Sequence, residues 1–321
     1  MEARQISTKI MNGDCIKMMQ TLPDKSVNCC VTSPPYFGLR DYGHDGQIGL
    51  EETPDAFVEK MVEVFSEVKR VLKDDGTLWL NIGDSYARTG GTDKKVSATA
   101  KVGSTRNTIK QMSNRTRHAP TGLKEKDLIG IPWMLAFALR ADGWYLRQDI
   151  IWAKPNPMPE SVTDRCTKSH EYIFLMSKSQ RYYFDSAAIA EPLAASSIAR
   201  LAQPNLKQQA GSDRVPGKTN GNMKAVGSGD TRNRRSVWTV ATQPYKGAHF
   251  ATYPSNLIRP CIIAGCPIDG TVLDPFGGSG TTAAVANEEG RNAVLCELNA
   301  EYIPLIEERI KNIKRKQLQL F

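Results

Sequence analysis

The sequence predicts an α/β fold of the doubly wound type, built around a mostly parallel, seven-stranded sheet. Short apolar runs, which are typical of the buried strands of a parallel sheet, alternate along the chain with stretches of helical periodicity. The chain has 321 residues, 40% of them apolar, and is therefore long enough to bury a substantial core. A glycine-rich turn follows one apolar run and leads into a helix, as at the ligand-binding edge of such sheets.

Seven segments are predicted as strands because they are short, apolar and bounded by polar or turn-forming residues. The second is nearly all apolar, which suits the middle of a parallel sheet. The fourth and fifth are expected to pair as an antiparallel hairpin. In chain order these segments are residues 9–12, 27–32, 77–82, 144–152, 171–177, 272–274 and 292–296.

Four segments have apolar residues at helical spacing. The first, residues 55–72, carries Asp55 near its start and basic residues near its end, as the helix dipole favours. The other three are residues 132–141, 280–287 and 302–313. Helices that separate strands in this way indicate a sheet covered on both faces.

The strand at 27–32 is followed directly by Ser33-Pro34-Pro35-Tyr36. Each proline fixes its own φ and lacks an N–H, and Pro35 also pushes Pro34 into an extended conformation. The turn is therefore rigid, and the carbonyl groups of Ser33 and Pro34 stay outside any sheet ladder. Taken alone, it equally fits a strand end whose tyrosine covers the core.

The glycine turn at 272–285 reads as a strand, a loop and the start of a helix. Its glycines allow a ligand to approach the backbone, and the helix start offers free N–H groups. Glu297 follows the next strand, at a suitable distance for binding ribose hydroxyls. The spacing of Gly278 and Gly280 also fits a dinucleotide-binding loop. Asp274 before the loop favours a cationic ligand over a pyrophosphate.

Taken together, these segments resemble the amino-methylating DNA methyltransferases, which move a methyl group from S-adenosylmethionine to the exocyclic amino group of cytosine or adenine. The order of the motifs, with Ser-Pro-Pro-Tyr before the glycine loop, is similar to the circularly permuted beta group. The resemblance implies the Rossmann-like methyltransferase fold. The matching segments are residues 12–14, 32–36, 71–84, 150–159, 170–179, 249–258, 273–282 and 295–303.

The resemblance also implies the cofactor-binding residues. Asp14 would contact the adenine side of S-adenosylmethionine, Asp274 would lie near the sulfonium or methionine portion, and Glu297 would hold the ribose hydroxyls. Thr281 would contribute at the methionine end. The loop residues expected to line the cofactor are Phe276, Gly277, Gly278 and Gly280.

The same resemblance explains the proline turn. A base inside a duplex must be flipped out before its amino group can meet a methyl donor. The Ser33 hydroxyl and the Pro34 carbonyl would accept hydrogen bonds from that amino group, Pro35 would keep the turn rigid, and Tyr36 would stack on the base. A nucleophilic cysteine is not needed, and Cys261 is expected in the core.

In the family that the chain resembles, the residue before Pro-Pro-Tyr is commonly serine in cytosine enzymes and aspartate in adenine enzymes. The resemblance therefore implies cytosine N4 as the methyl acceptor, with adenine N6 as the alternative. Two readings from other classes are a DNA-binding module without activity and, more distantly, a nicotinamide dehydrogenase. The sequence does not determine the recognition sequence. It also leaves open whether there is a partner restriction endonuclease, and whether the protein is a monomer or a homodimer.

The net charge of +8 is concentrated in two segments that are rich in Gly, Ser, Thr and Asn. Residues 86–127 hold ten Lys/Arg against three Asp/Glu, and residues 200–248 hold nine against two. Such segments fit solvated loops, or loops that bind the phosphates of duplex DNA. The residues expected to contact DNA are Lys94, Lys95, Lys101, Lys154, Arg165, Arg232, Arg234 and Arg235, with Trp152 as either a DNA contact or a core residue.

We therefore expect residues 1–85 and 128–199 to form the catalytic half and residues 249–321 the cofactor-binding half. Residues 86–127 would be an inserted loop that binds the DNA backbone, and residues 200–248 the target-recognition region.

Seven scattered cysteines and the absence of a secretory signal or a membrane-spanning run predict a cytoplasmic protein. The resemblance to DNA methyltransferases implies a nucleoid-associated protein of a prokaryote or phage. The four histidines lie far apart in the sequence, so no metal site is expected.

Overall fold

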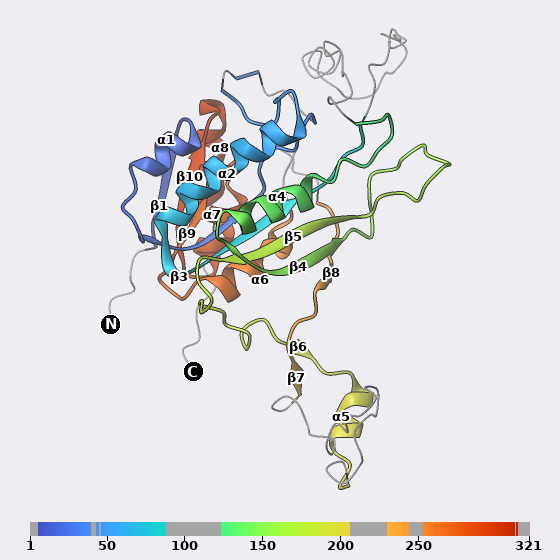
Figure 1. Ribbon diagram of the computed structural model, residues 1–321. Coiled ribbons are helices and arrows are strands. Elements are labelled where there is room, and N and C mark those ends of the chain that lie inside the picture. Colours follow the sequence, from blue (N-terminus) through green and yellow to red (C-terminus); the bar gives the residue numbers. More distant parts are fainter. Residues whose placement is uncertain are drawn as a thin grey trace.

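The computed structural model describes residues 6–39, 43–44, 46–87, 123–205, 230–243, 253–311 and 313 (Figure 1). Its centre is an eight-stranded sheet in the order β1-β10-β9-β2-β3-β5-β4-β8. Only β5 runs antiparallel to its neighbours within this sheet. The strands are β1 (Thr8–Asn12), β2 (Val27–Thr32), β3 (Leu72–Ile82), β4 (Tyr145–Ala153), β5 (His170–Ser177), β8 (Val237–Thr239), β9 (Thr271–Asp274) and β10 (Asn292–Glu297).

The sequence predicted seven of these strands, including the β4–β5 hairpin, and the expected number of seven is corrected to eight. The additional strand, β8, pairs in parallel with the end of β4, where Trp152 faces Trp238 in the register. It was missed because it has three residues and lies within a basic segment of turn-forming composition. Burial of Trp238, 4% exposed, holds this short strand at the sheet edge.

Helices cover both faces of the sheet, as the alternating pattern predicted (Figure 1). The helices α1, α2 and α4 enclose one apolar cluster, and α6, α7 and α8 enclose the other. A small separate sheet joins β6 (Glu191–Pro192) to β7 (Thr231–Arg232). The helices are α1 (Cys15–Gln20), α2 (Pro54–Val71), α4 (Ile131–Ala141), α5 (Ala195–Leu201), α6 (Ser255–Gly265), α7 (Thr281–Glu288) and α8 (Ile303–Lys311).

Local sequence signals account for the ends of α2. Thr53 caps its first turn by accepting a hydrogen bond from the Ala56 N–H at 3.1 Å, and Pro54 occupies the first helical position. Lys69 and Arg70 lie in its last turn. Its inward face, which includes Phe57 and Phe65, is completely buried. The helix is therefore fixed by capping at one end and by packing along its length.

The strands β2 and β9 lie side by side in the centre of the sheet, with Cys29 opposite Val272 and Cys30 opposite Leu273. The strand order runs outward in opposite directions from this pair, which makes it the topological switch point of the sheet. The two motif-bearing strands are therefore direct neighbours. Loops after both strands must overhang one crevice, although about 240 residues separate them.

Within the part of the chain that the structure describes, no helix combines the length and apolarity needed to cross a membrane. The expected DNA contacts Lys94, Lys95 and Lys101 lie outside the described residues, as does most of both basic segments.

Candidate active site

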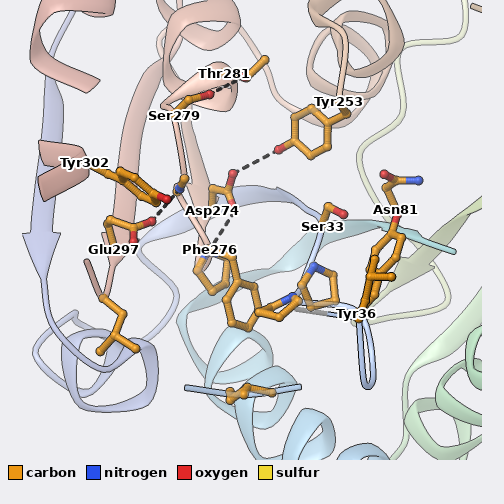
Figure 2. Close-up of a pocket in the computed structure, with 18 of the residues that line it drawn as sticks. Ser33, Tyr36, Asn81, Tyr253, Asp274, Phe276, Ser279, Thr281, Glu297 and Tyr302 are labelled. Atoms are coloured by element: carbon orange, nitrogen blue, oxygen red, sulfur yellow. Dashed lines mark hydrogen bonds between the residues drawn. The ribbon is translucent and has the colours of Figure 1, made fainter. Parts of the chain in front are cut away.

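A cleft of about 840 Å³ opens where β2 and β9 end, and both sequence motifs line it (Figure 2). Ser33, Pro34 and Tyr36 approach from the end of β2, and Phe276 and Gly278 from the end of β9. Its volume is in the range of sites that hold cofactor-sized molecules, roughly 300–1,000 Å³. The structure therefore brings the two motifs into a single site.

Asp274, at the end of β9, is the buried centre of this site, with 2% of its surface exposed. One of its carboxylate oxygens accepts hydrogen bonds from the Thr32 hydroxyl (2.6 Å) and the Phe276 N–H (3.0 Å). The other accepts from the hydroxyls of Tyr253 (3.1 Å) and Thr282 (2.5 Å). Four donors therefore connect the tips of β2 and β9 to the start of α7.

Burial has the largest effect on the pKa of the Asp274 carboxyl group. Desolvation raises the pKa of Asp274 to about 6, although its four hydrogen bonds act in the opposite direction. Since the native pKa exceeds the ordinary value near 3.8, the folded protein binds this proton more tightly than the unfolded chain does. The contribution of Asp274 to stability is therefore greatest in acid and falls as the pH rises through about 6.

We expect the Asp274→Asn variant to lose this pH dependence. When the pH is lowered from 7 to 5, the free energy of unfolding of the parent should rise by about 1 kcal/mol more than that of the variant. Denaturant titrations of both proteins at the two pH values measure the difference. Comparison with the variant removes the contributions of all other carboxyl groups. Equal pH dependence in the two proteins would show that Asp274 titrates normally.

The glycine loop follows Asp274 and folds against the end of β10. The Glu297 carboxylate, in a residue that is 9% exposed, accepts hydrogen bonds from the N–H groups of Gly278 (2.7 Å) and Asn299 (2.8 Å). Burial raises the pKa of Glu297 to about 6. Each oxygen keeps a second lone pair, and the residue lines the cleft. This carboxylate can therefore accept further hydrogen bonds from a bound molecule.

Close packing explains two of the glycines. A Cβ on Gly277 would lie 3.2 Å from the Cys296 carbonyl oxygen, a tight contact that glycine avoids where the loop lies against β10. Gly280 has a φ of +76°, and a Cβ there would lie 2.8 Å from the Ile306 side chain. Thr281 begins α7 and lines the cleft, and Arg309 donates to its hydroxyl at 2.8 Å.

Asp14 also lines the cleft, after β1. It caps α1 by accepting a hydrogen bond from the Lys17 N–H at 3.0 Å. The parallel pairing of β1 with β10 places Asn12 opposite Glu297, so Asp14 and Glu297 flank the same end of the cleft.

The Ser33–Tyr36 turn lies between the glycine loop and β3. Figure 2 shows Ser33 with Asp274 on one side and Tyr36 and Asn81 on the other. The Tyr36 hydroxyl donates a hydrogen bond to Glu171 at 2.6 Å. Burial, followed by the neighbouring Glu171 carboxylate, raises the pKa of Tyr36 well above its usual value, so it stays a neutral phenol.

The expected DNA contacts within the described residues have different environments. Lys154 lines the cleft, where it is paired with Glu171 and lies 4.2 Å from the Trp152 ring centroid. Trp152 is 4% exposed and is therefore a wall residue, part of the core and of the cleft lining at once. Arg165 pairs with Glu160 at 2.7 Å and stacks over Tyr86 at 4.0 Å, outside the cleft lining.

The three arginines expected to contact DNA in the second basic segment lie in β7 or between β7 and β8, and they do not line the cleft. Arg232 and Arg235 both approach Glu191, at 3.5 and 3.4 Å. Arg234 stacks over the buried Trp238 at 4.7 Å, whereas the Arg235 side chain is 69% exposed. Cys261 is buried in α6, as expected, and burial raises the pKa of its thiol.

Several residues that complete the site lie in segments that the sequence analysis matched, but it gave them no individual role. Tyr253 and Thr32 bind Asp274, Glu171 binds Tyr36, and Gly83 packs directly against the Tyr36 ring. Within the described ranges, no group of three or more His, Cys, Asp or Glu side chains is arranged to hold a metal ion.

Residues 27–308 match the N6/N4 methyltransferase family model, which is described as "DNA methylase". The chain is 47% identical to the Type II methyltransferase M.SmaI of Serratia marcescens over 312 residues, which cover 97% of this chain and 93% of that protein. It is also 47% identical to the Type II methyltransferase M.Cfr9I of Citrobacter freundii over 308 residues, 94% of this chain and 87% of that protein.

Two solved structures share the fold. The PvuII DNA methyltransferase, described as cytosine-N4-specific, superposes with a TM-score of 0.62 at 17% identity, covering 96% of this chain and 88% of that chain. A DNA modification methylase from Thermus thermophilus, described as putative and solved in complex with S-adenosyl-L-methionine, superposes with a TM-score of 0.57 at 21% identity, covering 94% and 93%. Both confirm the α/β architecture with its mostly parallel sheet.

Proposed function

The chain belongs to the N6/N4 DNA methylase family, and from this premise we propose that it methylates the exocyclic N4 amino group of cytosine in duplex DNA. The methyl donor of the family is S-adenosylmethionine, which supplies an electrophilic methyl group on a sulfonium. The observation that carries the proposal is the meeting of Ser33 and Pro34 with the glycine loop in one cleft.

The cleft suits this cofactor. The Glu297 carboxylate has lone pairs for ribose hydroxyls, and Gly277 and Gly278 line the cleft beside it. Asp14, Phe276 and Thr281 line the same space. Gly280, with its positive φ, turns the chain into α7. We assign these residues to cofactor binding.

We propose a structural role for Asp274 in addition to the place near the sulfonium or methionine portion that the resemblance implies. Both of its oxygens already accept two hydrogen bonds from protein groups, so it holds the loop and both strand tips in place. We propose that it acts on the cofactor through the loop it orders.

On the DNA side, the Ser33 hydroxyl and the Pro34 carbonyl accept hydrogen bonds from the amino group of an extrahelical base. These bonds direct the nitrogen lone pair toward the methyl group and stabilise the charge that develops on nitrogen. Pro35 keeps the acceptors rigid, and the Tyr36 ring packs against the base. Serine at position 33 supports cytosine over adenine as the acceptor.

The test is nucleoside analysis of DNA incubated with the protein and S-adenosylmethionine. We expect N4-methylcytosine, and no product from the Ser33→Ala variant. N6-methyladenine would instead identify the alternative, an adenine methyltransferase. Cofactor binding without any methylated nucleoside would favour a DNA-binding module that lacks activity.

We further propose that the protein serves in restriction-modification, since its relatives are Type II methyltransferases. From this role we infer a partner endonuclease with the same recognition sequence. We also infer that the protein acts on prokaryotic or phage DNA in the cytoplasm. We assign residues 86–127 to binding of the DNA backbone, through Lys94, Lys95 and Lys101 and with the help of the nearby Arg165. We assign residues 200–248 to target recognition.

Within the target-recognition region, neighbouring arginines should differ in function. Arg235 is exposed and available to a base edge, so Arg235→Gln should lower cognate affinity about tenfold or more and leave thermal stability unchanged. Arg234 is stacked on Trp238, so Arg234→Gln should instead lower the melting temperature. Titrations on cognate and random duplexes, together with thermal unfolding, measure both effects. Equal behaviour of the two variants would contradict this division.

A further inference from the structure

The cleft contains a second polar group, beside the Ser33–Tyr36 turn, of which the assigned roles use only the Tyr36 ring. We call it the Glu171 cluster, and it consists of Tyr36, Asn81, Lys154 and Glu171. All four side chains line the cleft, although they come from the β2 tip, from β3 and from the two strands of the hairpin. Its members converge on one carboxylate.

Three donors bind the Glu171 carboxylate. Oε2 accepts hydrogen bonds from the Tyr36 hydroxyl at 2.6 Å and from Asn81 Nδ2 at 3.3 Å, and Oε1 accepts from Lys154 Nζ. The Lys154 and Glu171 side chains are only 17% and 15% exposed. A charge pair this well shielded from solvent holds its geometry better than a surface ion pair does.

Only one member of the cluster has hydrogen-bond donors left for a ligand. A carboxylate can only accept hydrogen bonds, and Asn81 Nδ2 already donates to Glu171 and to the Tyr172 carbonyl at 3.0 Å. The Lys154 ammonium carries three N–H groups and places one on Glu171. The Trp152 ring, 4.2 Å from Nζ, supports it from the side. Of the four side chains, Lys154 therefore has spare donors facing the cleft.

These donors complement one edge of cytosine. When the amino group of the base binds Ser33 and Pro34, N3 and O2 remain as adjacent hydrogen-bond acceptors. An ammonium group with two spare N–H groups can serve both. Adenine offers a ring nitrogen next to its amino group, but a C–H group where cytosine has O2. The pairing with Glu171 keeps the wall close to neutral, so an uncharged base can enter.

On the basis of the proposed function, we propose that Lys154 binds N3 and O2 of the extrahelical cytosine, and that Glu171 is the positioning residue that holds Lys154 and Tyr36 in place. Lys154 is thereby assigned to the target base itself and not to the DNA backbone. The reaction chemistry stays with Ser33 and Pro34.

The experiment compares Lys154→Met with the parent on two duplexes of the cognate sequence, which is first located by mapping methylated sites. One duplex carries cytosine at the target position, and the other carries 3-deazacytosine, which lacks the N3 acceptor. Single-turnover rates of the parent should be about tenfold to a hundredfold higher on cytosine. For Lys154→Met this ratio should fall toward one, and its rate on cytosine should fall by a similar factor.

The Glu171→Gln variant should reduce the same ratio, because Lys154 loses its anchor, and should lower kcat more than it raises KM for DNA. Glu63→Gln is the matched control. It makes the same chemical change in an exposed glutamate that pairs with Lys60 at 2.6 Å on α2, and it should leave the ratio unchanged. Calorimetric S-adenosylmethionine affinity should be unchanged in all three variants, which shows that they are folded.

A Lys154→Met variant that binds the cofactor and keeps the parental ratio would overturn the proposal, even if its rate fell equally on both duplexes. That outcome would mean that Lys154 has a structural role and does not contact the base. Failure of the proposed function looks different, because the parent itself would then yield N6-methyladenine.

Discussion

Replacing Glu297 with alanine should reduce the affinity for S-adenosylmethionine by about 100-fold or more. The carboxylate has lone pairs left for two ribose hydroxyls after it accepts the N–H groups of Gly278 and Asn299. Hydrogen bonds to a charged group contribute roughly 1.5–3 kcal/mol each, so two of them account for at least that factor. The loss also removes the anchor of the Gly278 N–H, which loosens the loop.

Isothermal titration calorimetry of the parent and the variant measures this effect. Glu301→Ala is the matched control, since Glu301 is an exposed glutamate four residues further along the chain. Because burial raises the pKa of Glu297 to about 6, affinity of the parent should also weaken as the pH falls below that value. A Glu297→Ala variant with parental affinity would remove Glu297 from the cofactor site.

Much of the fold followed from local patterns. Strands such as β2 and β10 are short apolar runs, and α2 carries its own capping and dipole signals. The ends of each could therefore be predicted to within about one residue. The meeting of the two motifs could be predicted as well, because parallel strands at a switch point bring their carboxyl ends together. What failed were elements without a local signal, such as the three residues of β8.

The inner architecture of the site was less predictable because its partners are far apart in sequence. Asp274 binds Thr32 across 242 positions, and Tyr36 binds Glu171 across 135. Neither contact leaves a periodic or compositional trace in one chain. Glu171 lies in a segment that was recognised, but nothing local distinguishes it from a surface glutamate next to a strand. Only the pairing of β3 with β5 places it beside Asn81 and Tyr36.

Gly83 illustrates the same limit and leads to the second large effect. The residue follows β3 directly, and a Cβ there would lie 2.7 Å from Tyr36 Cε2 and 3.2 Å from the Glu171 side chain. Real Cβ atoms essentially never approach so closely, so one side chain would have to move. The glycine is therefore required for space, and the space it leaves is where the Tyr36 ring lies.

We expect Gly83→Ala to lower the single-turnover methyl-transfer rate by about 100-fold, since even small displacements of positioning groups are that costly. Affinity for S-adenosylmethionine should stay within about twofold of the parent, because the cofactor loop lies on β9 and β10. A double-mutant cycle with Tyr36→Ala identifies the cause. Once the ring is removed the added methyl group meets no obstacle from it, so Gly83→Ala should cost little further rate in the Tyr36→Ala background. If the two losses multiplied instead, the clash with Tyr36 would not be the reason that position 83 needs glycine.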